Sequence, residues 1–448
     1  MGMKIAIGID LGSTTSKAVM LDEERRIIGR GITNSRSNYD VASAVARGEA
    51  EVDARMSLLR RAVDERAESF SEPGRVTKAV ERAFRETQVR EGLTHLREAA
   101  LQNAALDAYS RWHGSIEGVL AEVFDAMEAD VAPRYREESD NEQLFFRDLA
   151  SSGFTEHAGD RADRRVLPFE VLMGIFDKSI LQVEGMVLDS SFDDRFHGIL
   201  AEVLGVIGAT ATESASVTEL VRQVAAIELE TVAMVGTGYG RARLPFAREC
   251  IRSEILCHGL GANVMFPGTA TVLDIGGQDT KAMQVDEAGL VTSFHMNDRC
   301  AAGCGRFLGY IADEMNLGLH ELAPLALAAE RQVKINSTCT VFAGAELRER
   351  LSIGQRREDI VAGLHRAIIL RALSLLARAG GVRPEFTFTG GVARNEAAVK
   401  SLAELVMENY QIDRINISPD SIYTGALGAA HFAWRSNEHD DAEKEVAA

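Results

Sequence analysis

The sequence contains few cysteines and no apolar run long enough to cross a membrane. Its 448 residues include only 5 cysteines, an odd number that does not suit the disulfide framework of a small secreted protein. The thiols are therefore expected to be buried apolar side chains, metal ligands or reactive groups in a reducing compartment. No apolar stretch approaches the roughly 20 residues of a transmembrane helix, so we expect no membrane partner.

Net positive charge and a leader segment are also lacking. The chain carries 49 Lys and Arg against 67 Asp and Glu, a net charge of −18, which argues against nucleic acid as the main partner. The opening segment "MGMKIAIGIDLG" enters a strand pattern directly, without the basic start, apolar segment and cleavage site of a signal peptide. We therefore expect a cytoplasmic protein.

The length and the hydrophobic pattern predict an α/β protein of two or three domains. The first 35 residues predict strands over 4–9 and 16–21 and near Ile27, a β-meander. Charged segments rich in Ala, Glu and Arg then predict helices to about residue 211, because their apolar residues recur at spacings of three and four. Further helices are predicted over 306–315, 342–351 and 357–379, and from Glu396 and Thr424.

An internal repeat organises the predicted strands. The segment "IAIGIDLGSTTSKAVML" and the segment "TVLDIGGQDTKAMQV" each contain a strand ending in Asp, a glycine turn, a Lys and a second strand. Such a repeat predicts two similar α/β lobes. We expect 1–35 to start the first lobe, 36–211 to be a helical insertion, 212–268 to complete the first lobe, 269–435 to form the second lobe with the cysteines discussed below, and 436–448 to be a disordered tail.

Three glycine-containing turns predict a nucleotide site. In "DLGSTTSK" the backbone N–H groups after Asp10 form a row of donors suited to phosphate oxygens, and Lys17 adds a positive charge. In "DIGGQDTK" a matching turn follows Asp274, and "FTGGVARNEAAV" places two glycines where a flat nucleoside could approach the backbone. The predicted nucleotide-binding residues are Gly12, Ser13, Thr14, Thr15, Lys17, Gly276, Gly277, Gly390, Gly391 and Asn395.

The two aspartates suggest how ATP would be hydrolysed. Asp10 and Asp274, one from each half, would flank a Mg²⁺ ion held mainly through water. One of them, or Gln278 or Asp279, could orient the attacking water, and we name Asp10, Asp274 and Gln278 as candidate catalytic residues. The three turns in this order resemble the actin-like ATPase superfamily. A Walker-type P-loop is absent from the sequence.

Two cysteines stand where a loop is predicted to become a helix: Cys300 in "NDRCAAGCGRFL" and Cys339 in "NSTCTVFAGAEL". A helix N-terminus lowers the pKa of a thiol and favours anionic ligands, so both positions suit thiolates bound to an iron–sulfur cluster. Two thiolates fill half of a four-cysteine shell, and a symmetric or pseudo-symmetric second subunit would complete it. The alternative is a pair of buried thiols without a ligand.

All five segments together resemble the activator ATPases of 2-hydroxyacyl-CoA dehydratases and the ATPase subunits of benzoyl-CoA reductase, over about 3–32 and 214–434. The resemblance implies an actin-like fold of two ribonuclease-H-like lobes, with a large and mostly helical insertion in this chain. It implies ATP, Mg²⁺ and one 4Fe-4S cluster shared by two such subunits, in a homodimer or heterodimer, with Cys300 and Cys339 as ligands. It also implies that reduced ferredoxin supplies an electron, which ATP hydrolysis drives at very low potential to a catalytic acyl-CoA reductase partner.

The chain departs from the family pattern in two places. Cys304 stands where members usually have Thr, so it is either an inert neighbour or a spare ligand. The segment 36–211 is absent from the short dehydratase activators, which favours the larger ATPase subunit of a benzoyl-CoA reductase. The alternatives are a dehydratase activator with an enlarged cap, a small-molecule kinase of the actin-like superfamily, and an actin-like polymer.

Two further cysteines and a histidine are expected to be structural. Cys250 and Cys257 are seven residues apart, a spacing that would place them on one face of a helix, and core packing is the better interpretation. His258 follows Cys257 directly, but one Cys–His pair falls short of a zinc shell.

Overall fold

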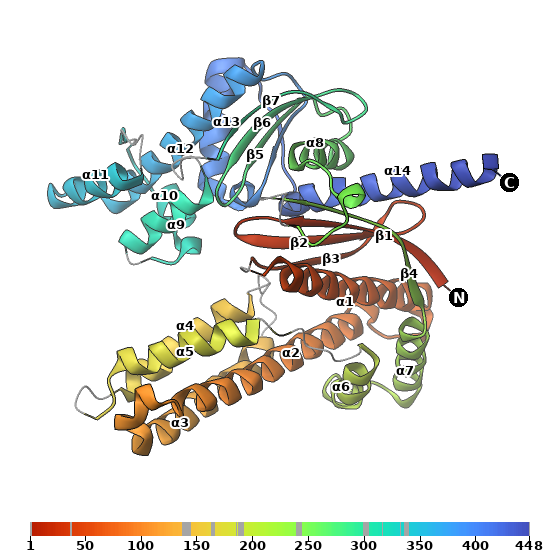
Figure 1. Ribbon diagram of the computed structural model, residues 1–448, viewed down its shortest axis with the longest axis vertical. Helices are drawn as coiled ribbons and strands as arrows, with labels where there is room; N and C mark the ends of the chain where they lie inside the picture. The colour runs from red at the N-terminus through yellow and green to blue at the C-terminus, as the bar shows by residue number, and fades with distance from the viewer. Residues whose placement is uncertain are drawn as a thin grey trace. The chain divides into compact units, whose positions relative to one another are not determined.

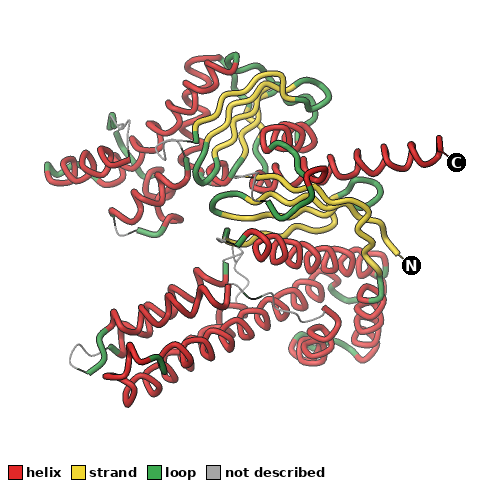
Figure 2. The backbone as a smooth tube through the Cα atoms, in the orientation of Figure 1, coloured by secondary structure: helices red, strands yellow, loops and turns green. Residues whose placement is uncertain are grey.

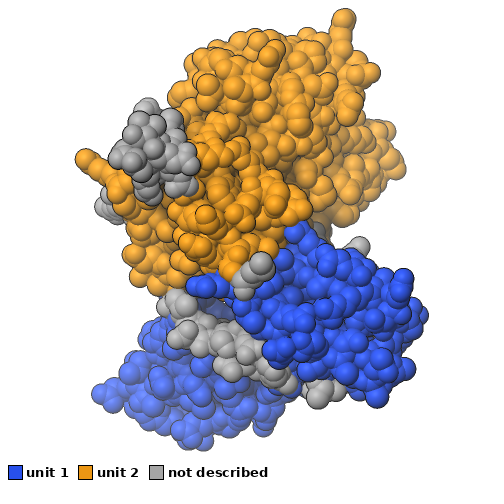
Figure 3. All heavy atoms as spheres, turned by 90° about the vertical axis from the view of Figure 1, so that its right-hand side faces the viewer, with its two compact units in different colours: residues 1, 52–228 blue, residues 2–51, 229–448 orange. Residues whose placement is uncertain are grey.

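The computed structural model describes residues 2–35, 38–136, 145–162, 166–184, 186, 192–238, 244–298, 304–315, 317–331, 333–335 and 340–447. The described chain divides into two compact units, which Figure 3 colours separately. Unit 1 contains Val52–Glu228, and unit 2 contains Gly2–Glu51 and Leu229–Ala448. Each unit is described by itself below.

Unit 1 is helical throughout its described residues up to the start of β4 (Figures 1 and 2). Its helices are the end of α1 (Tyr39–Glu65), η1 (Ala67–Ser69), α2 (Pro73–Ala104), η2 (Asp107–Trp112), α3 (His113–Arg136), α4 (Phe146–Arg161), α5 (Phe169–Glu184), α6 (Phe192–Val206) and α7 (Ala211–Ala225). Stacked aromatic rings fill the space between α3, α4 and α5. The ring of Phe154 lies 5.8 Å from that of Phe124 and 4.6 Å from that of Phe176, distances typical of favourable aromatic pairs.

Local sequence signals account for where two of these helices begin. Pro73 occupies the first turn of α2, where its missing N–H costs no hydrogen bond. Thr210 and Glu213 form a capping box at α7: the backbone N–H of Glu213 donates to Thr210 Oγ1 at 3.2 Å, and that of Thr210 donates to Glu213 Oε2 at 2.9 Å. The start of α7 is thus specified within four residues.

Unit 2 contains two β-sheets, drawn as strands in Figure 2. The first has the order β3-β2-β1-β4, and the second has the order β7-β6-β5-β8-β9. The strands are β1 (Gly2–Leu11), β2 (Thr15–Leu21), β3 (Ile27–Asn34), β4 (Glu228–Gly238), β5 (Thr271–Ile275), β6 (Thr280–Val285), β7 (Val291–Asn297), β8 (Phe386–Thr389) and β9 (Ile415–Asn416). Each sheet contains an antiparallel meander, β1-β2-β3 in one and β5-β6-β7 in the other. The predicted opening meander is therefore confirmed.

The two meanders also repeat in register. Asp10 pairs with Lys17 between β1 and β2, and Asp274 pairs with Lys281 between β5 and β6. Each Asp lies near the carboxyl end of its strand, just before the glycine turn. The repeat seen in the sequence is thus a repeat of backbone geometry.

The helices of unit 2 enclose both sheets. They are the start of α1, η4 (Arg248–Cys250), α8 (Glu254–Met265), α9 (Gly305–Glu314), η6 (Leu319–Glu321), α10 (Leu322–Leu327), α11 (Thr340–Ser352), α12 (Arg357–Ala379), η7 (Gly391–Arg394), α13 (Glu396–Tyr410), η8 (Pro419–Tyr423) and α14 (Thr424–Ala447). In β5 the side chains alternate between faces, so Leu273 and Ile275 join the core with α9–α13 while Val272 packs with Ile255 of α8. The same alternation turns Asp274 toward α8.

Helix α8 is held against α14 by direct backbone contact. A Cβ at Gly261 would lie 2.0 Å from the carbonyl oxygen of Thr424, and one at Gly428 would lie 1.9 Å from that of Cys257. Glycine is required at both positions because any side chain would separate the helices. This contact fixes α8 between the two sheets, as Figure 1 shows.

Two expectations differ from the structure. Cys250 belongs to η4, and α8 begins only at Glu254, so Cys250 and Cys257 do not share a helix face. The tail expected to be disordered from residue 436 is part of α14, which continues to Ala447. Within this part of α14, Glu438 forms an ion pair with Arg25 of the turn between β2 and β3.

Helix α12 is the described helix that is long and apolar enough to span a membrane. More than half of its most apolar segment is buried inside unit 2, where Leu364, Ile368 and Leu376 pack into the core of the second sheet. Its apolar composition is therefore explained by this packing.

Candidate nucleotide site

Charged side chains from β1, β2, β5, β6 and α8 meet at the carboxyl ends of β1 and β5. Lys17 Nζ lies 3.9 Å from Asp10 Oδ2. Lys281 Nζ lies 3.5 Å from Asp274 Oδ1, and its side chain is 2% exposed. We call the following residues the carboxylate cluster: Asp10, Lys17, Glu254, His258, Asp274, Asp279 and Lys281.

The second Asp–Lys pair is far more densely surrounded than the first. Lys281 Nζ contacts Asp279 Oδ2 at 2.8 Å and Glu254 Oε1 at 2.9 Å. Asp274 Oδ2 accepts a hydrogen bond from Thr389 Oγ1 at 2.8 Å and lies 3.1 Å from His258 Nδ1. The buried ammonium group is therefore held by three carboxylates, which satisfies a charge that would otherwise be too costly to bury.

Electrostatic coupling controls the protonation of this cluster. Burial opposes the charged forms, yet His258 and Lys281 outweigh it and hold the pKa of Asp274 well below its usual range. For the same reason the surrounding carboxylates raise the pKa of Lys281 and, through Asp274, the pKa of His258. Burial raises the pKa of Glu254 more than Lys281 lowers it.

The two predicted phosphate turns lie against each other. A Cβ at Gly277, in the second turn, would lie 2.1 Å from Thr14 Oγ1 in the first. Backbone hydrogen bonds hold both turns: Ser35, just after β3, donates to the carbonyl of Thr14 at 2.8 Å, and Gly276 donates to that of Asp279 across the second turn at 3.0 Å. The structure therefore brings the predicted residues of these two turns together.

The third predicted turn adjoins the second sheet. Gly390 has φ +88°, and a Cβ there would lie 2.4 Å from the carbonyl oxygen of Ile275, so only glycine fits. Gly391 is exposed and begins η7. Asn395 caps α13, its Oδ1 accepting from the backbone N–H of Ala398 at 2.9 Å, so its side chain has a structural role.

The positions of the other predicted residues do not by themselves indicate a function. Gly12, Ser13 and Thr15 lie in or beside the first turn and are half-buried or exposed. Gln278 is half-buried in the turn between β5 and β6. Its assignment as a catalytic residue stays a prediction.

The sequence interpretation missed Glu254, His258, Lys281 and Thr389. Two signals could have identified three of them. Lys281 is the repeat counterpart of Lys17, and the spacing of Glu254 and His258 places both on one face of a helix. From the sequence alone, His258 was considered only as a metal partner of Cys257. Adjacent residues of a helix point in different directions, so the two side chains do not face the same site.

The second phosphate turn is bonded directly to α9. The backbone N–H of Gly305 donates to the carbonyl oxygen of Gly276 at 2.8 Å, and that of Arg306 donates to that of Gly277 at 2.7 Å. These are the first two residues of α9, whose N–H groups lack partners within the helix. Two backbone hydrogen bonds therefore join the second turn to the start of this helix.

Helix α9 in turn contacts α11. A Cβ at Gly344 would lie 2.4 Å from the hydroxyl oxygen of Tyr310, and Arg348 forms an ion pair with Glu314. Cys300 and Cys339, the predicted cluster ligands, lie outside the described residues. Cys304 is the N-cap residue of α9 and is 1% exposed within the core that β5 shares with α9–α13, which favours a packing role.

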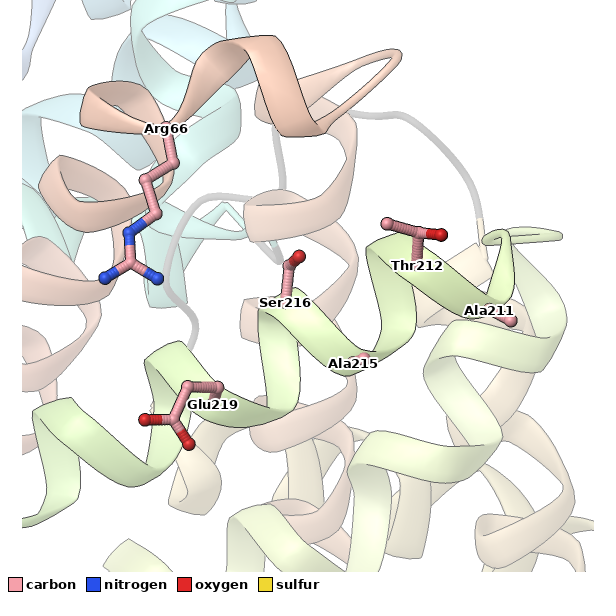
Figure 4. A pocket seen from close by; sticks show the side chains of 6 residues that line it. All are labelled: Arg66, Ala211, Thr212, Ala215, Ser216 and Glu219. Atoms are coloured by element: carbon pink, nitrogen blue, oxygen red, sulfur yellow. The ribbon is translucent and has the colours of Figure 1, made fainter.

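The hollow shown in Figure 4 is separate from these residues. It lies on unit 1, has a volume of about 570 Å³ and is lined by Arg66 and by residues of α7. Its charged groups have local partners: Glu219 contacts Arg222 at 2.7 Å, and Arg66 donates to Gln223 at 3.3 Å. These pairings give no indication of a ligand.

The two sheets with paired meanders and facing Asp–Lys turns define an ATPase of the actin-like fold class. The chain belongs to the BadF/BadG/BcrA/BcrD ATPase family, whose model matches residues 7–433.

Several characterised proteins are similar to this chain. The (R)-2-hydroxyglutaryl-CoA dehydratase activating ATPase of Acidaminococcus fermentans is 39% identical over 239 residues, 53% of this chain and 89% of that protein. The 2-hydroxyisocaproyl-CoA dehydratase activator of Clostridioides difficile is 42% identical over 48% of this chain and 77% of its own length. A subunit of the benzoyl-CoA reductase of Thauera aromatica is 32% identical over 41% of this chain and 64% of that protein.

Solved structures confirm the predicted fold class. A component of the A. fermentans (R)-2-hydroxyglutaryl-CoA dehydratase aligns with a TM-score of 0.54 and 22% identity over 97% of this chain and 99% of that one. The C. difficile activator with bound ADPNP aligns with a TM-score of 0.51 and 22% identity over 98% of this chain and 97% of that one.

Family membership implies ATP and Mg²⁺, and the described residues fit both. Asp10 is 3% exposed, and its Oδ1 atom has no hydrogen-bond partner among the described residues. A buried, unsatisfied carboxylate oxygen beside two phosphate turns suits a hydrated cation. Lys17 on the neighbouring strand adds the positive charge that phosphate oxygens require.

Proposed function

We propose that this protein is an ATP-hydrolysing activator that delivers electrons at low potential to a 2-hydroxyacyl-CoA dehydratase. One observation supports the mechanism most strongly: the second phosphate turn is hydrogen-bonded to the first two residues of α9. Helix α9 follows the segment that contains Cys300, so the site of hydrolysis is connected through the backbone to a predicted cluster ligand.

The choice of partner is supported by the relatives. The dehydratase activators are 39% and 42% identical and match 89% and 77% of their own lengths, whereas the benzoyl-CoA reductase subunit is 32% identical over 64% of its length. The benzoyl-CoA reductase role expected from the sequence is therefore the less supported of the two. The dehydratase alternative replaces it as the main proposal.

We propose the following roles in hydrolysis for the residues of the turns and the carboxylate cluster. The N–H groups of the two turns would bind the phosphates, and Lys17 would neutralise their charge. Mg²⁺, when bound beside Asp10 and Asp274, supplies charge neutralisation between the phosphate groups. Asp274 is kept ionised by His258 and Lys281, so it can orient water or accept its hydrogen bonds.

The coupling is conformational. Loss of the terminal phosphate removes contacts that hold the two turns together, and the second turn then moves relative to Thr14. Because α9 is bonded to that turn and packed against α11, both helices follow. We propose that Cys300 and Cys339, with the same cysteines of a second subunit, bind a 4Fe-4S cluster that stores one electron from reduced ferredoxin.

Unit 1 is proposed to be a helical insertion in the first lobe. Its position in the chain between β3 and β4 leaves the strand order of the first sheet intact. Such an insertion could form the surface that the dehydratase recognises. We propose a cytoplasmic location.

The decisive experiment is anaerobic reconstitution. The purified protein should bind about four iron atoms per dimer and should activate a 2-hydroxyacyl-CoA dehydratase only with ATP and a low-potential reductant. The Asp274→Asn variant should retain iron but lose both ATP hydrolysis and activation. Absence of iron from carefully reconstituted protein, or activation that continues in Asp274→Asn, would refute the proposal, and activation of a benzoyl-CoA reductase alone would overturn the choice of partner.

A further inference from the structure

Helix α8 places a histidine and a glutamate against Asp10, within the carboxylate cluster. His258 Nε2 lies 4.0 Å from Asp10 Oδ2 and 4.0 Å from Glu254 Oε1. One ligand atom from each of these three residues lies within 4.8 Å of the other two. Two atoms bound to a common ion at about 2.1 Å are at most about 4.2 Å apart, so small shifts suffice to enclose a cation.

The second ring nitrogen of His258, Nδ1, faces a carboxylate, as the second ring nitrogen of a metal-bound histidine usually does. Its Nδ1 lies 3.1 Å from Asp274 Oδ2, an oxygen that also accepts from Thr389. When Nδ1 carries the proton and donates to Asp274, Nε2 is left with its lone pair facing Asp10 and Glu254. A histidine ligand almost always has such a carboxylate behind it, which fixes the ring and raises its basicity.

Two features describe the surroundings of these three residues. Asp10 Oδ1 is buried and lacks a hydrogen-bond partner among the described residues. A Cβ at Gly425, the second residue of α14, would lie 2.7 Å from His258 Nε2 and 2.9 Å from Asp10 Oδ2. The backbone of Gly425 therefore packs directly against both side chains, and any larger residue there would displace them.

The charge of the carboxylate cluster favours a divalent cation. The cluster contains four carboxylates and two lysine ammonium groups. In the metal-bound form, in which the cation displaces the proton of His258 Nε2 and all four carboxylates are ionised, the side chains carry two negative charges. A single divalent ion balances them, and the second lone pair of Glu254 Oε1 stays available because Lys281 occupies only one.

We propose that Asp10, Glu254 and His258 bind a divalent first-row transition-metal ion of the Mn²⁺ type in the absence of nucleotide. A nitrogen ligand beside two carboxylates suits Mn²⁺, Fe²⁺ or Co²⁺ better than Mg²⁺, which prefers oxygen ligands and retains its water. The site would give the ATPase a resident metal next to the first phosphate turn. This inference does not depend on the electron partner, because it concerns the protein without ATP.

The test uses the full-length protein without nucleotide or Mg²⁺, titrated with MnCl₂ and followed by electron paramagnetic resonance. Mn²⁺ is the probe because thiolates bind it weakly compared with zinc. We expect one tightly bound Mn²⁺ per chain, displaced by Mg²⁺ only in large excess. Pulsed measurements should show ¹⁴N modulation from a directly bound imidazole.

Variants assign that nitrogen to His258. His258→Gln should abolish the ¹⁴N modulation and weaken Mn²⁺ binding by at least about tenfold. His431→Gln is the matched control, since His431 is 8% exposed against 6% for His258 and stands on α14 as another buried histidine. Gly425→Ala should also weaken binding, because its methyl group would push His258 Nε2 and Asp10 Oδ2 apart without removing a ligand.

Three results would overturn the inference: no Mn²⁺ bound without nucleotide, no ¹⁴N modulation in the unaltered protein, or Mn²⁺ affinity unchanged in both His258→Gln and Gly425→Ala. If His258→Gln does not fold, the modulation of the unaltered protein and the affinity of Gly425→Ala decide the question. A positive result alongside a failed dehydratase assay would retain the metal site and reject only the proposed partner.

Discussion

The backbone N–H of Gly305 donates to the carbonyl oxygen of Gly276 at 2.8 Å, and this bond joins the start of α9 to the second phosphate turn. The bond requires no particular side chain, yet it connects the two regions that the proposed mechanism must couple. Its neighbour, from Arg306 to Gly277, makes the connection rigid in two places. The turn and the helix should therefore move as one body.

Replacing Gly305 with proline should uncouple hydrolysis from electron delivery. Proline is tolerated at the first position of a helix but has no N–H to donate to Gly276, and its ring occupies the place of that hydrogen. We expect the number of electrons delivered per ATP hydrolysed to fall by about tenfold. This factor corresponds to the loss of one hydrogen bond worth about 1.4 kcal/mol. Gly305→Ala keeps the N–H and is the control; equal ratios in the two variants would contradict the coupling.

Adjacent glycines in the third turn should respond differently to alanine. Gly390→Ala places a Cβ 2.4 Å from the carbonyl oxygen of Ile275 at a φ of +88°, whereas a Cβ at Gly391 meets no atom within 4 Å. We expect Gly390→Ala to lower the free energy of unfolding by about 1–3 kcal/mol, and Gly391→Ala to have a much smaller effect. Urea denaturation measures both, and a similar loss in the two variants would rule out this explanation.

The repeated lysines should differ in what they stabilise. Lys281→Met removes the shared partner of three buried carboxylates and should cost about 3–5 kcal/mol of folding stability. Lys17→Met should cost less, because among the described residues Lys17 has one ion pair, at 3.9 Å, and should mainly weaken ATP binding. Denaturant midpoints measure the stability of both variants, and nucleotide titrations measure their affinity for ATP. A Lys281→Met protein more stable than the unaltered one would show that Lys281 does not stabilise the carboxylate cluster.

The capping box of α7 should make stability depend on acidity. Hydrogen bonds from Ser71 and Thr210 lower the pKa of Glu213 from 4.5 to about 2. Its folded-state pKa is depressed, so its ionised form stabilises the protein fully above pH 4.5, and this contribution is lost as the pH falls toward 2. The difference in urea midpoint between the unaltered protein and Glu213→Gln should therefore shrink between pH 6 and pH 3.

A matched control separates that effect from a general response to acid. Glu117 is an exposed glutamate of α3, and Glu117→Gln should leave the urea midpoint nearly unchanged at every pH. If the difference in urea midpoint between the unaltered protein and Glu213→Gln stays constant with pH, the negative charge of Glu213 does not contribute to stability.

Much of the fold could be predicted because its signals are local. The opening meander, the repeat and the start of α12 at Arg357 follow from alternation, from glycine turns and from helical spacing within short segments. The charged composition of the last residues is typical of a disordered end, whereas the structure continues α14 to Ala447, with Glu438 in an ion pair with Arg25 of the turn between β2 and β3.

In the candidate site, too, some features follow from local sequence and others only from tertiary packing. The sequence by itself determined the two aspartates, Lys17 and the glycine turns, since strand pairing across a short turn brings residues together whatever the rest of the chain does. Only the tertiary structure decided that His258 and Glu254 meet Asp10, and that α9 is bonded to the second turn. These contacts depend on how α8 and α9 pack against strands that are distant in the sequence. The bonds between α9 and the second turn join backbone atoms, which every residue type has, so the amino-acid sequence does not reveal them.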